Sequence, residues 1–324
     1  NYTRAKMQRR MAQIEESVAR YLQQLDSADR QEPSDALSMR ADRLREKLAK
    51  LKAEMARLEA LEMERLASDD QQISLTDPDA RSMATSGRGS GVVGYNVQAA
   101  VDCEHHLIVA HEVITVGNDR AQLSPMAQMA KAALQVETLE AVADRGYYDS
   151  QEILICETDG VAVTLPKPMT SGAKVHGRFT KLDFRYVAED DVYVCPAGER
   201  LTYRFTREEA GLRLRRYWTN ACGGCAIKSQ CTTSRQRRVS RWEHEAVLET
   251  VQRRLDEDPQ AMRRRRETVE HPFGTIKSRM GATHFLMKRL GNVRTEMALH
   301  VLAYNLTRVM NILGPGQLMQ AIRA

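Results

Sequence analysis

Two stretches near the start of the chain repeat apolar residues at alternating steps of four and three positions. This spacing places the apolar side chains along one face of a helix. Helices are predicted over residues 3–26 and 37–58, and Glu-Pro-Ser-Asp at 32–35 separates them. We expect them to pair as an antiparallel hairpin over residues 1–67 that serves as a structural or oligomerisation arm. The apolar positions are Met7, Met11, Ile14, Val18, Tyr21 and Leu25, followed by Leu37, Ala41, Leu44, Leu48, Leu51, Met55 and Leu58.

The pattern changes to short alternating elements after residue 91. Residues 68–91 show no periodicity and are rich in Asp-Pro and Ser-Gly combinations, so we predict a linker. Strands and helices then alternate up to residue 166, an order that predicts a three-layer α/β domain. Asp119 is placed to cap the first of these helices. The predicted strands cover residues 92–102, 107–115, 139–144 and 161–166, and the predicted helices cover 121–134 and 151–158.

A long segment with short β-like pieces interrupts this alternation. It covers residues 167–254, which is too long for a loop inside a compact domain. We therefore predict an inserted subdomain. Residues 255–313 return to the α/β domain with a helix around Glu270 and an apolar terminal helix, and residues 314–324 form a tail.

The charge of the chain is small in total but unevenly distributed. The sequence has 48 Lys and Arg against 43 Asp and Glu, a net charge of +5. Residues 261–324 alone carry 11 basic and 3 acidic side chains, and residues 200–241 carry 11 and 2. Concentrated positive charge is typical of a protein that binds a polyanion. A solvated basic surface without a partner explains the same pattern equally well.

Two acidic residues occupy positions that suit metal-dependent chemistry. Asp144 ends an apolar strand, and Glu270 lies on a helix in the spacing Arg266-x3-Glu270-x6-Lys277, which keeps the three side chains near one side. An acid on a strand and an acid on a helix can share a metal, as in two-metal sites for phosphoryl transfer. Taken alone, Asp144 also suits a turn at Asp-Arg-Gly, and Glu270 could pair with Arg266 four residues earlier.

Four of the six cysteines lie within the predicted insertion. Cys222-Gly-Gly-Cys225 has the spacing of a metal knuckle, and Cys195 and Cys231 would complete a tetrahedral Cys₄ zinc site. A small Arg-rich insertion with few large apolar residues needs such a staple, so we expect a structural zinc ribbon. Without zinc, the four would be ordinary reduced thiols.

Arginines alternate with aromatic residues around these cysteines. This combination suits a DNA backbone with stacked bases. A packed β surface with solvated arginines fits equally well. The residues are Arg213, Arg215, Arg216, Arg235, Arg237, Arg238 and Arg241, with Tyr217, Trp218 and Trp242.

Several short motifs, in this order and separation, are similar to those of one family. They are Gly94-Tyr95-Asn96-Val97-Gln98, Asp144-Arg145-Gly146-Tyr147-Tyr148, the Arg266, Glu270 and Lys277 motif, and Leu302-Ala303-Tyr304-Asn305-Leu306. The chain resembles the DDE transposases of bacterial insertion sequences. The resemblance implies an RNase H-like mixed sheet flanked by helices, with a β-rich insertion before the third catalytic acid.

The resemblance also implies roles for individual residues. Asp144 matches the second catalytic carboxylate and Glu270 the third, and both would bind Mg²⁺ or Mn²⁺. Arg266, Lys277 and Arg145 would hold DNA phosphates, Arg by a bidentate fork and Lys as a point charge.

The first catalytic acid has no clear match in the sequence. The family places it on the earliest of three strands, and only two strands are predicted before the helix that precedes Asp144. The chain begins at Asn1 without an initiating Met, so we expect this acid upstream of it, in a longer reading frame that is truncated here. Asp102, at a strand end, and Asp77 or Asp79, in the linker, are weaker candidates.

The implied activity is metal-dependent cleavage at transposon ends and strand transfer into target DNA. The expected partner is double-stranded DNA, as terminal inverted repeats and target, bound by a homodimer in the synaptic complex. No membrane span is predicted, and the expected location is the bacterial cytoplasm at the nucleoid. The alternatives are an RNase H-like nuclease without strand transfer and an inactive DNA-binding remnant.

Overall fold

The structure is a computed structural model that describes residues 4–29, 35–67, 71–83, 92–168, 172–173 and 175–323. Contacts between elements group the chain into two units. The first unit holds Asn1–Gln98, His111–Asn118 and Ile276–Ala324, and the second holds Ala99–Ala110 and Asp119–Thr275. The domain boundaries expected from the sequence stay a prediction, because these units are defined by packing and not by independent folding.

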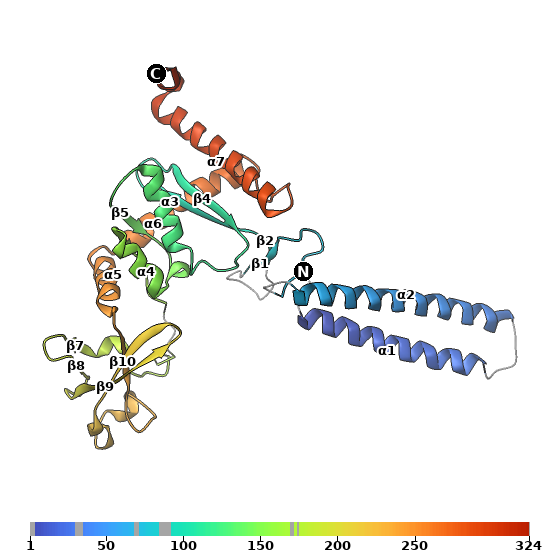
Figure 1. Cartoon of the computed structure of the whole chain (residues 1–324), viewed down its shortest axis with the longest axis horizontal. Helices are drawn as coiled ribbons and strands as arrows, with labels where there is room; N and C mark the ends of the chain where they lie inside the picture. Colours follow the sequence, from blue (N-terminus) through green and yellow to red (C-terminus); the bar gives the residue numbers. More distant parts are fainter. Residues whose placement is uncertain are drawn as a thin grey trace. The chain divides into compact units, whose positions relative to one another are not determined.

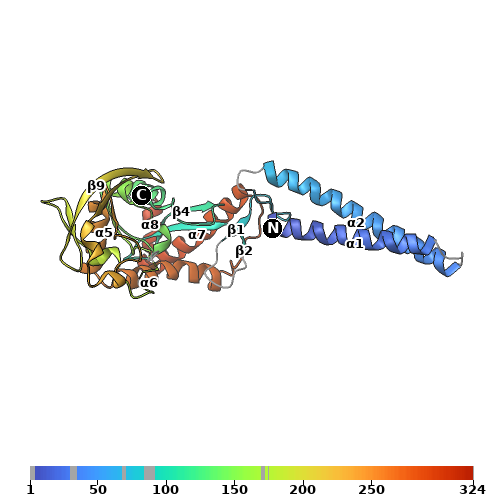
Figure 2. The same ribbon diagram turned by 90° about the horizontal axis from the view of Figure 1, so that it is seen from below.

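Two long helices pair in the first unit. Helix α1 covers Arg4–Asp29 and α2 covers Asp35–Ala67, and both views show them side by side (Figures 1 and 2). Arg10, early in α1, forms a two-pronged hydrogen bond of 2.9 and 3.0 Å to Glu54, late in α2, so the helices run antiparallel. The predicted apolar stripe forms their interface, where Met7 and Ile14 are fully buried.

The remaining helices of the first unit follow near the end of the chain. Helix α7 covers Leu290–Leu313 and α8 covers Pro315–Arg323, so the predicted tail is helical. Gly314 separates them with φ +81°, a conformation that favours glycine at a helix end. Among the helices of the described residues, none combines the length and apolar character needed to cross a bilayer.

Two acids of the predicted linker hold the start of α7. The backbone N–H of Arg289 donates to Asp77 (3.1 Å) and that of Leu290 donates to Asp79 (2.8 Å). The first amides of a helix lack partners within the helix, and carboxylates also favour its positive end. The described part of residues 68–91 is therefore structured, and it includes strand β1 (Arg81–Met83), which pairs antiparallel with β2 (Val92–Gly94).

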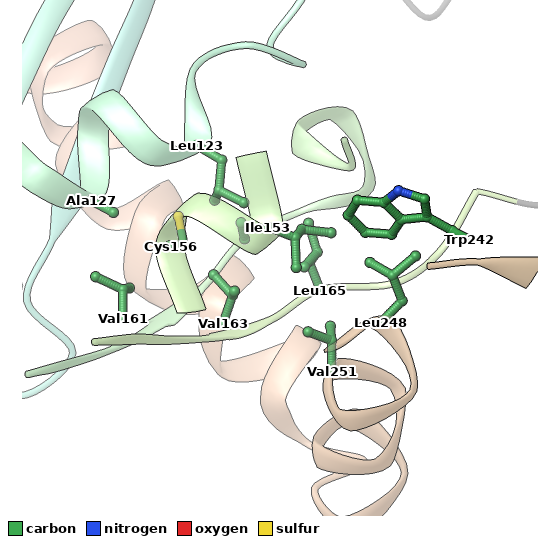
Figure 3. Packing of buried hydrophobic residues seen from close by; sticks show 11 residues of the cluster. Leu123, Ala127, Ile153, Cys156, Val161, Val163, Leu165, Trp242, Leu248 and Val251 are labelled. Carbon is green, nitrogen blue, oxygen red and sulfur yellow. The ribbon is translucent and has the colours of Figure 1, made fainter. Parts of the chain in front are cut away.

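The second unit has its apolar core around a pair of parallel strands. Strand β5 (Leu139–Val142) pairs with β6 (Val161–Thr164), with α3 (Leu123–Leu134), α4 (Ser150–Thr158) and α5 (Glu245–Glu257) packed nearby. Figure 3 shows Ile153 of α4 and Val163 of β6 within the cluster of buried side chains, and both are fully buried. Trp242 lies in the same cluster, so it packs in the core and cannot stack on DNA bases as the sequence suggested.

A second strand pair contributes to both units. Strands β3 (Asn96–Val101) and β4 (Ile108–Ile114) form a separate two-stranded sheet. The α/β class is confirmed. The single mixed sheet expected for an RNase H-like fold is not seen, because no strand of the described residues joins the β3 and β4 pair to the β5 and β6 pair.

The predicted insertion is built on a five-stranded antiparallel sheet in the second unit. Its spatial order is β11-β10-β9-β8-β7. A tight turn at Ala210 and Gly211, both with positive φ, joins β9 to β10 in the manner of a type I′ hairpin. The strands cover Arg185–Val187 (β7), Val192–Val194 (β8), Arg200–Glu209 (β9), Leu212–Trp218 (β10) and Val239–Trp242 (β11).

Candidate functional site

Asp144 lies where β5 leaves the sheet. The N–H of Ala143 still donates to Thr164 (3.0 Å), whereas Asp144 begins a 3₁₀ turn over Arg145–Tyr147. Its Oδ1 accepts a hydrogen bond of 2.7 Å from the N–H of Gly146. Asp144 is 43% exposed, so the carboxylate shapes the turn and still reaches solvent. The structural role in the turn is confirmed, and the catalytic role stays a prediction.

Helix α6 (Ala261–Gly274) packs against β5 and brings a cation to Asp144. Arg265 donates from Nη2 to Oδ2 of Asp144 at 2.8 Å. Further along α6, the ring of His271 lies 4.9 Å from that of His106, in the turn between β3 and β4. The sequence singled out Arg266, but Arg265 faces the acid, because buried Thr268 sets which side of the helix points inward.

The four consecutive arginines on α6, residues 263–266, differ in their ion-pair partners. Arg263 pairs with Glu267, Arg264 with Asp258, and Arg265 with Asp144. Arg266 is exposed and has no ion pair or hydrogen bond with any residue that the structure describes. It is therefore the arginine of this run that is available to a phosphate.

Glu270 is exposed on the outer side of α6. Within the described ranges it has neither a hydrogen bond nor an ion pair, so the surface pair with Arg266 does not form. Glu270 follows Arg265 by five positions, which turns it about 140° around the helix from the side that meets Asp144. The structure thus brings Asp144 and α6 together, with Arg265 rather than Glu270 at the contact.

The other predicted phosphate-binding residues lie outside α6. The helix ends at Gly274, after Pro272 removes one backbone donor, and Lys277 lies in a π-helical turn over Thr275–Arg279. This π-helical turn continues α6 directly, so a shared side for Glu270 and Lys277 stays a prediction. Arg145 is exposed in the 3₁₀ turn that follows Asp144.

Asp119 is a neighbour of Asp144 that the sequence did not reveal. We expected it to cap a helix, but Gln122 holds the cap position of α3 and no side chain caps it. A methyl group added to Gly146 would lie 2.9 Å from Oδ1 of Asp144 and 3.2 Å from Oδ2 of Asp119. Burial, and then the negative charges of Asp119 and Asp144, raise the pKa of Tyr147. No periodicity or spacing in the sequence signals this approach.

The weaker candidates for the first acid have structural partners. Asp102 accepts from the N–H of His105 at 2.6 Å and closes the turn between β3 and β4. Asp77 is buried, and it also accepts a 2.6 Å hydrogen bond from the Tyr95 hydroxyl. Although burial raises the pKa of Asp77, these hydrogen bonds outweigh it and lower the pKa overall. Asp79 contacts α7, as described above. Each of the three acids is therefore engaged in a local structural contact.

Metal-ligating geometry is not preformed. Within the described part of the chain, no group of three or more His, Cys, Asp or Glu side chains is arranged to hold a metal ion. At Asp144, the guanidinium of Arg265 supplies the neighbouring positive charge.

The four cysteines of the insertion nevertheless line one cavity. Cys195, Cys222, Cys225 and Cys231 surround a space of about 20 Å³, and all are free thiols. Burial raises the pKa of Cys231, and the nearby Arg237 partly offsets this. Cys103 is exposed and Cys156 is buried elsewhere.

One face of the five-stranded sheet carries cations stacked on an aromatic ring. The guanidinium groups of Arg204 and Arg238 lie 5.5 and 5.2 Å from the ring centre of Trp218. Phe205, 42% exposed, meets the same ring edge-on at 5.8 Å. Tyr217, by contrast, is fully buried. We call Arg204, Phe205, Trp218 and Arg238 the Trp218 surface.

The site thus combines an acid at a strand end with a basic helix that contacts it and carries a second acid. Residues 194–310 match the model of the family described as Transposase DDE domain. Over this part, which is less than half of the chain, the resemblance to DDE transposases is confirmed. No curated protein and no solved structure matches the chain.

The match covers part of the candidate site and indicates a class of reaction. The matched residues include Arg265, Arg266, Glu270 and Lys277, whereas Asp144 precedes them. The match supports a function related to DNA transposition and suggests an enzyme of the polynucleotidyl transferase or nuclease type, a family that normally uses divalent metal ions.

Proposed function

We propose that this protein is a DNA transposase of an insertion sequence. It cleaves DNA at the transposon ends and joins the released 3′-hydroxyl to target DNA. One observation carries the proposal: α6, which lies in the family match and bears Glu270, packs on β5 and contacts Asp144. The two catalytic carboxylates would then be Asp144, at the end of β5, and Glu270, which is exposed on α6.

Asp144 and Glu270 would hold Mg²⁺ or Mn²⁺. Carboxylate oxygens are the ligands that these hard cations prefer, and both side chains are accessible to solvent. When bound, the cation would activate the attacking oxygen and neutralise charge on the phosphate. Arg265 occupies Oδ2 of Asp144 and would have to withdraw before a cation binds that oxygen.

The cationic residues would orient the DNA backbone at this site. Arg266 has no partner among the described residues, and its planar guanidinium can bind a phosphate through two hydrogen bonds. Arg145 projects from the turn that Asp144 begins, so a phosphate close to Asp144 is within the reach of a long side chain. Lys277 would add a point charge further along the backbone.

The Trp218 surface would bind DNA outside the reacting centre. Arg204 and Arg238 are cations without a carboxylate partner in the described ranges, and Trp218 keeps them side by side. Guanidinium groups held over an aromatic ring lose less rotamer freedom on binding phosphate. Exposed Phe205 offers a face on which an unpaired base at a cleaved end can stack.

The test of the function is strand transfer by the complete gene product on labelled transposon-end DNA, with Mg²⁺ or Mn²⁺. Asp144→Asn and Glu270→Gln should each reduce cleavage and joining to background. Glu267→Gln is the matched control, because Glu267 lies on the same helix and pairs only with Arg263 at the surface. Activity that survives either of the first two substitutions would overturn the assignment. Cleavage without joining would instead identify a nuclease, and binding without cleavage a DNA-binding remnant.

The Trp218 surface is tested separately by the salt dependence of DNA binding. A double variant with Arg204→Gln and Arg238→Gln loses two phosphate contacts. The magnitude of its slope of log affinity against log salt concentration should therefore fall by about 2. Arg200→Gln, on the same sheet but paired with Asp190, should leave the slope near that of the unmodified protein. Equal slopes for all three proteins would exclude this surface from DNA binding.

A further inference from the structure

Three separate turns of the insertion converge on the cysteine cavity. Cys195 follows β8 in a tight turn, where its carbonyl accepts from Gly198 (2.8 Å) and its N–H donates to Glu199 (2.9 Å). Gly198 has φ +85°, which lets the chain reverse within four residues. Cys195 is therefore presented at the tip of a short, hydrogen-bonded loop.

The other three cysteines lie on or next to two consecutive 3₁₀ turns. Cys222 belongs to the turn Asn220–Gly223, which Thr219 caps by accepting from the N–H of Ala221 (3.3 Å). Cys231 ends the turn Lys228–Gln230 and donates to the carbonyl of Lys228 at 2.9 Å. Cys225 lies between these turns, and its carbonyl accepts a hydrogen bond from the N–H of Lys228 (3.2 Å). Each thiol is thus held on a short constrained segment.

The cavity has room for one small molecule or ion. About 20 Å³ is enough for one water molecule or one metal ion, and little more. Its lining brings together four of the six cysteines of the chain, from segments up to 36 positions apart, while excluding Cys103 and Cys156. A cluster this selective is unusual for thiols that serve only as small apolar side chains.

Arg237 supplies an independent indication of negative charge on the groups that line the cavity. It lines the same cavity, with its guanidinium 5.4 Å from the ring centre of Phe184. Its Nε is buried, and among the residues that the structure describes none accepts a hydrogen bond from it. An unpaired buried donor is costly. Four thiolates around a divalent cation carry two net negative charges, which a guanidinium N–H directed at sulfur would partly neutralise.

We propose that Cys195, Cys222, Cys225 and Cys231 form a structural site for a borderline-soft divalent cation such as Zn²⁺, with the Nε–H of Arg237 donating a hydrogen bond to a ligating sulfur. The thiols are not yet in ligating positions, so their side chains turn into the cavity on binding. Four thiolates fill a tetrahedral shell, so this site is separate from catalysis at Asp144.

The site would organise the strand that carries the Trp218 surface. Trp218 is the last residue of β10, and only Thr219 separates it from the turn that holds Cys222. A bound cation therefore fixes the end of β10 as well as the turn after β8. The effect on DNA rests on the proposed function, whereas the metal site itself does not.

Metal content of the full chain tests the site without an activity assay. The protein, purified without chelator and without a metal-binding tag, should contain about one zinc per chain by mass spectrometry. Cys222→Ser and Cys195→Ser should each lose it, and Cys103→Ser, at an exposed and isolated thiol, should retain it. Absence of metal after refolding with zinc, or an equal loss in Cys103→Ser, would overturn the proposal.

Cobalt substitution tests the unmodified chain, in case the serine variants do not fold. Co²⁺ in four thiolates should give strong sulfur-to-metal charge transfer in the near ultraviolet and intense visible bands of a tetrahedral ion. A spectrum without these bands would overturn the proposal. Fewer than six titratable thiols in the denatured, unreduced protein would do so as well, because disulfides would then explain the cluster.

The role of Arg237 has its own control. Arg237→Gln should weaken zinc binding by about 10- to 100-fold in competition with a chelator, as the loss of a hydrogen-bond donor to a metal ligand does. Arg235→Gln, two positions away and exposed, should not. Equal affinities for these two variants would remove Arg237 from the site.

Discussion

Gly146 packs so closely against Asp144 that a single added methyl group should affect both stability and activity. In Gly146→Ala, the new Cβ would lie 2.9 Å from Oδ1 of Asp144 and 3.2 Å from Oδ2 of Asp119. Carbon and oxygen at 2.9 Å overlap, so at least one carboxylate must move. The backbone at Gly146 has no positive φ, so alanine is strained by this contact alone.

The cost to stability should be modest, because the atoms that move are the ends of side chains. Asp144 is 43% exposed and would trade the hydrogen bond from Gly146 for water. The loss of one such hydrogen bond corresponds to about 1 kcal/mol of unfolding free energy. The cost to chemistry should be larger, since displacement of a catalytic group by about 1 Å can reduce the rate by roughly 10²-fold.

Two measurements on the same protein separate these effects. Denaturant unfolding should give a loss of about 1 kcal/mol, whereas strand transfer should fall by roughly 10²-fold. Gly291→Ala is the control, because nothing lies within 4 Å of its added Cβ and it is inside α7. Unchanged strand transfer by Gly146→Ala would refute the reasoning. So would an unfolding free energy that falls far enough to explain the whole loss of activity.

Three further predictions concern charge and packing. Arg265→Gln removes the cation that competes for Asp144, so half-maximal activity should require less Mg²⁺ than in the unmodified protein; an unchanged requirement would show that the ion pair does not compete. Asp77→Asn should cost about 1 to 3 kcal/mol at pH 7. Because the folded-state pKa of Asp77 is lowered, its contribution is present above its unfolded pKa and is lost as pH falls through the folded one. Unfolding curves for both proteins should therefore converge in acid, and a gap independent of pH would contradict this origin. Ile153→Ala should destabilise the protein by about 2 to 5 kcal/mol, whereas Ile155→Ala, 41% exposed on the same helix, should cost much less.

Local patterns were sufficient for much of the secondary structure. The apolar stripe of α1 and α2, the strands around Asp144 and the helix around Glu270 all follow from the period of apolar residues, which depends on neighbours in sequence. Asp144 at a strand end could be predicted for the same reason. The motif containing Glu270 indicated the transposase family, which the match over residues 194–310 confirmed.

Positions that depend on contacts between distant segments were not predicted. Arg265 meets Asp144 from 121 positions away, and one residue of difference from Arg266 is decided by how α6 packs. Asp77 and Asp79 were expected in a linker. Each instead accepts a hydrogen bond from a backbone N–H at the start of α7, more than 200 positions later.

The sequence by itself determined the class of elements, the order of the acids and the resemblance to a transposase family that the match supports. Only the tertiary structure decided that Asp119 approaches Gly146, that Trp242 is buried, and that four cysteines share one cavity with Arg237. The physical reason is that helix and strand periods are local, whereas the direction of a polar side chain is chosen by whichever distant partner satisfies it when the core is packed.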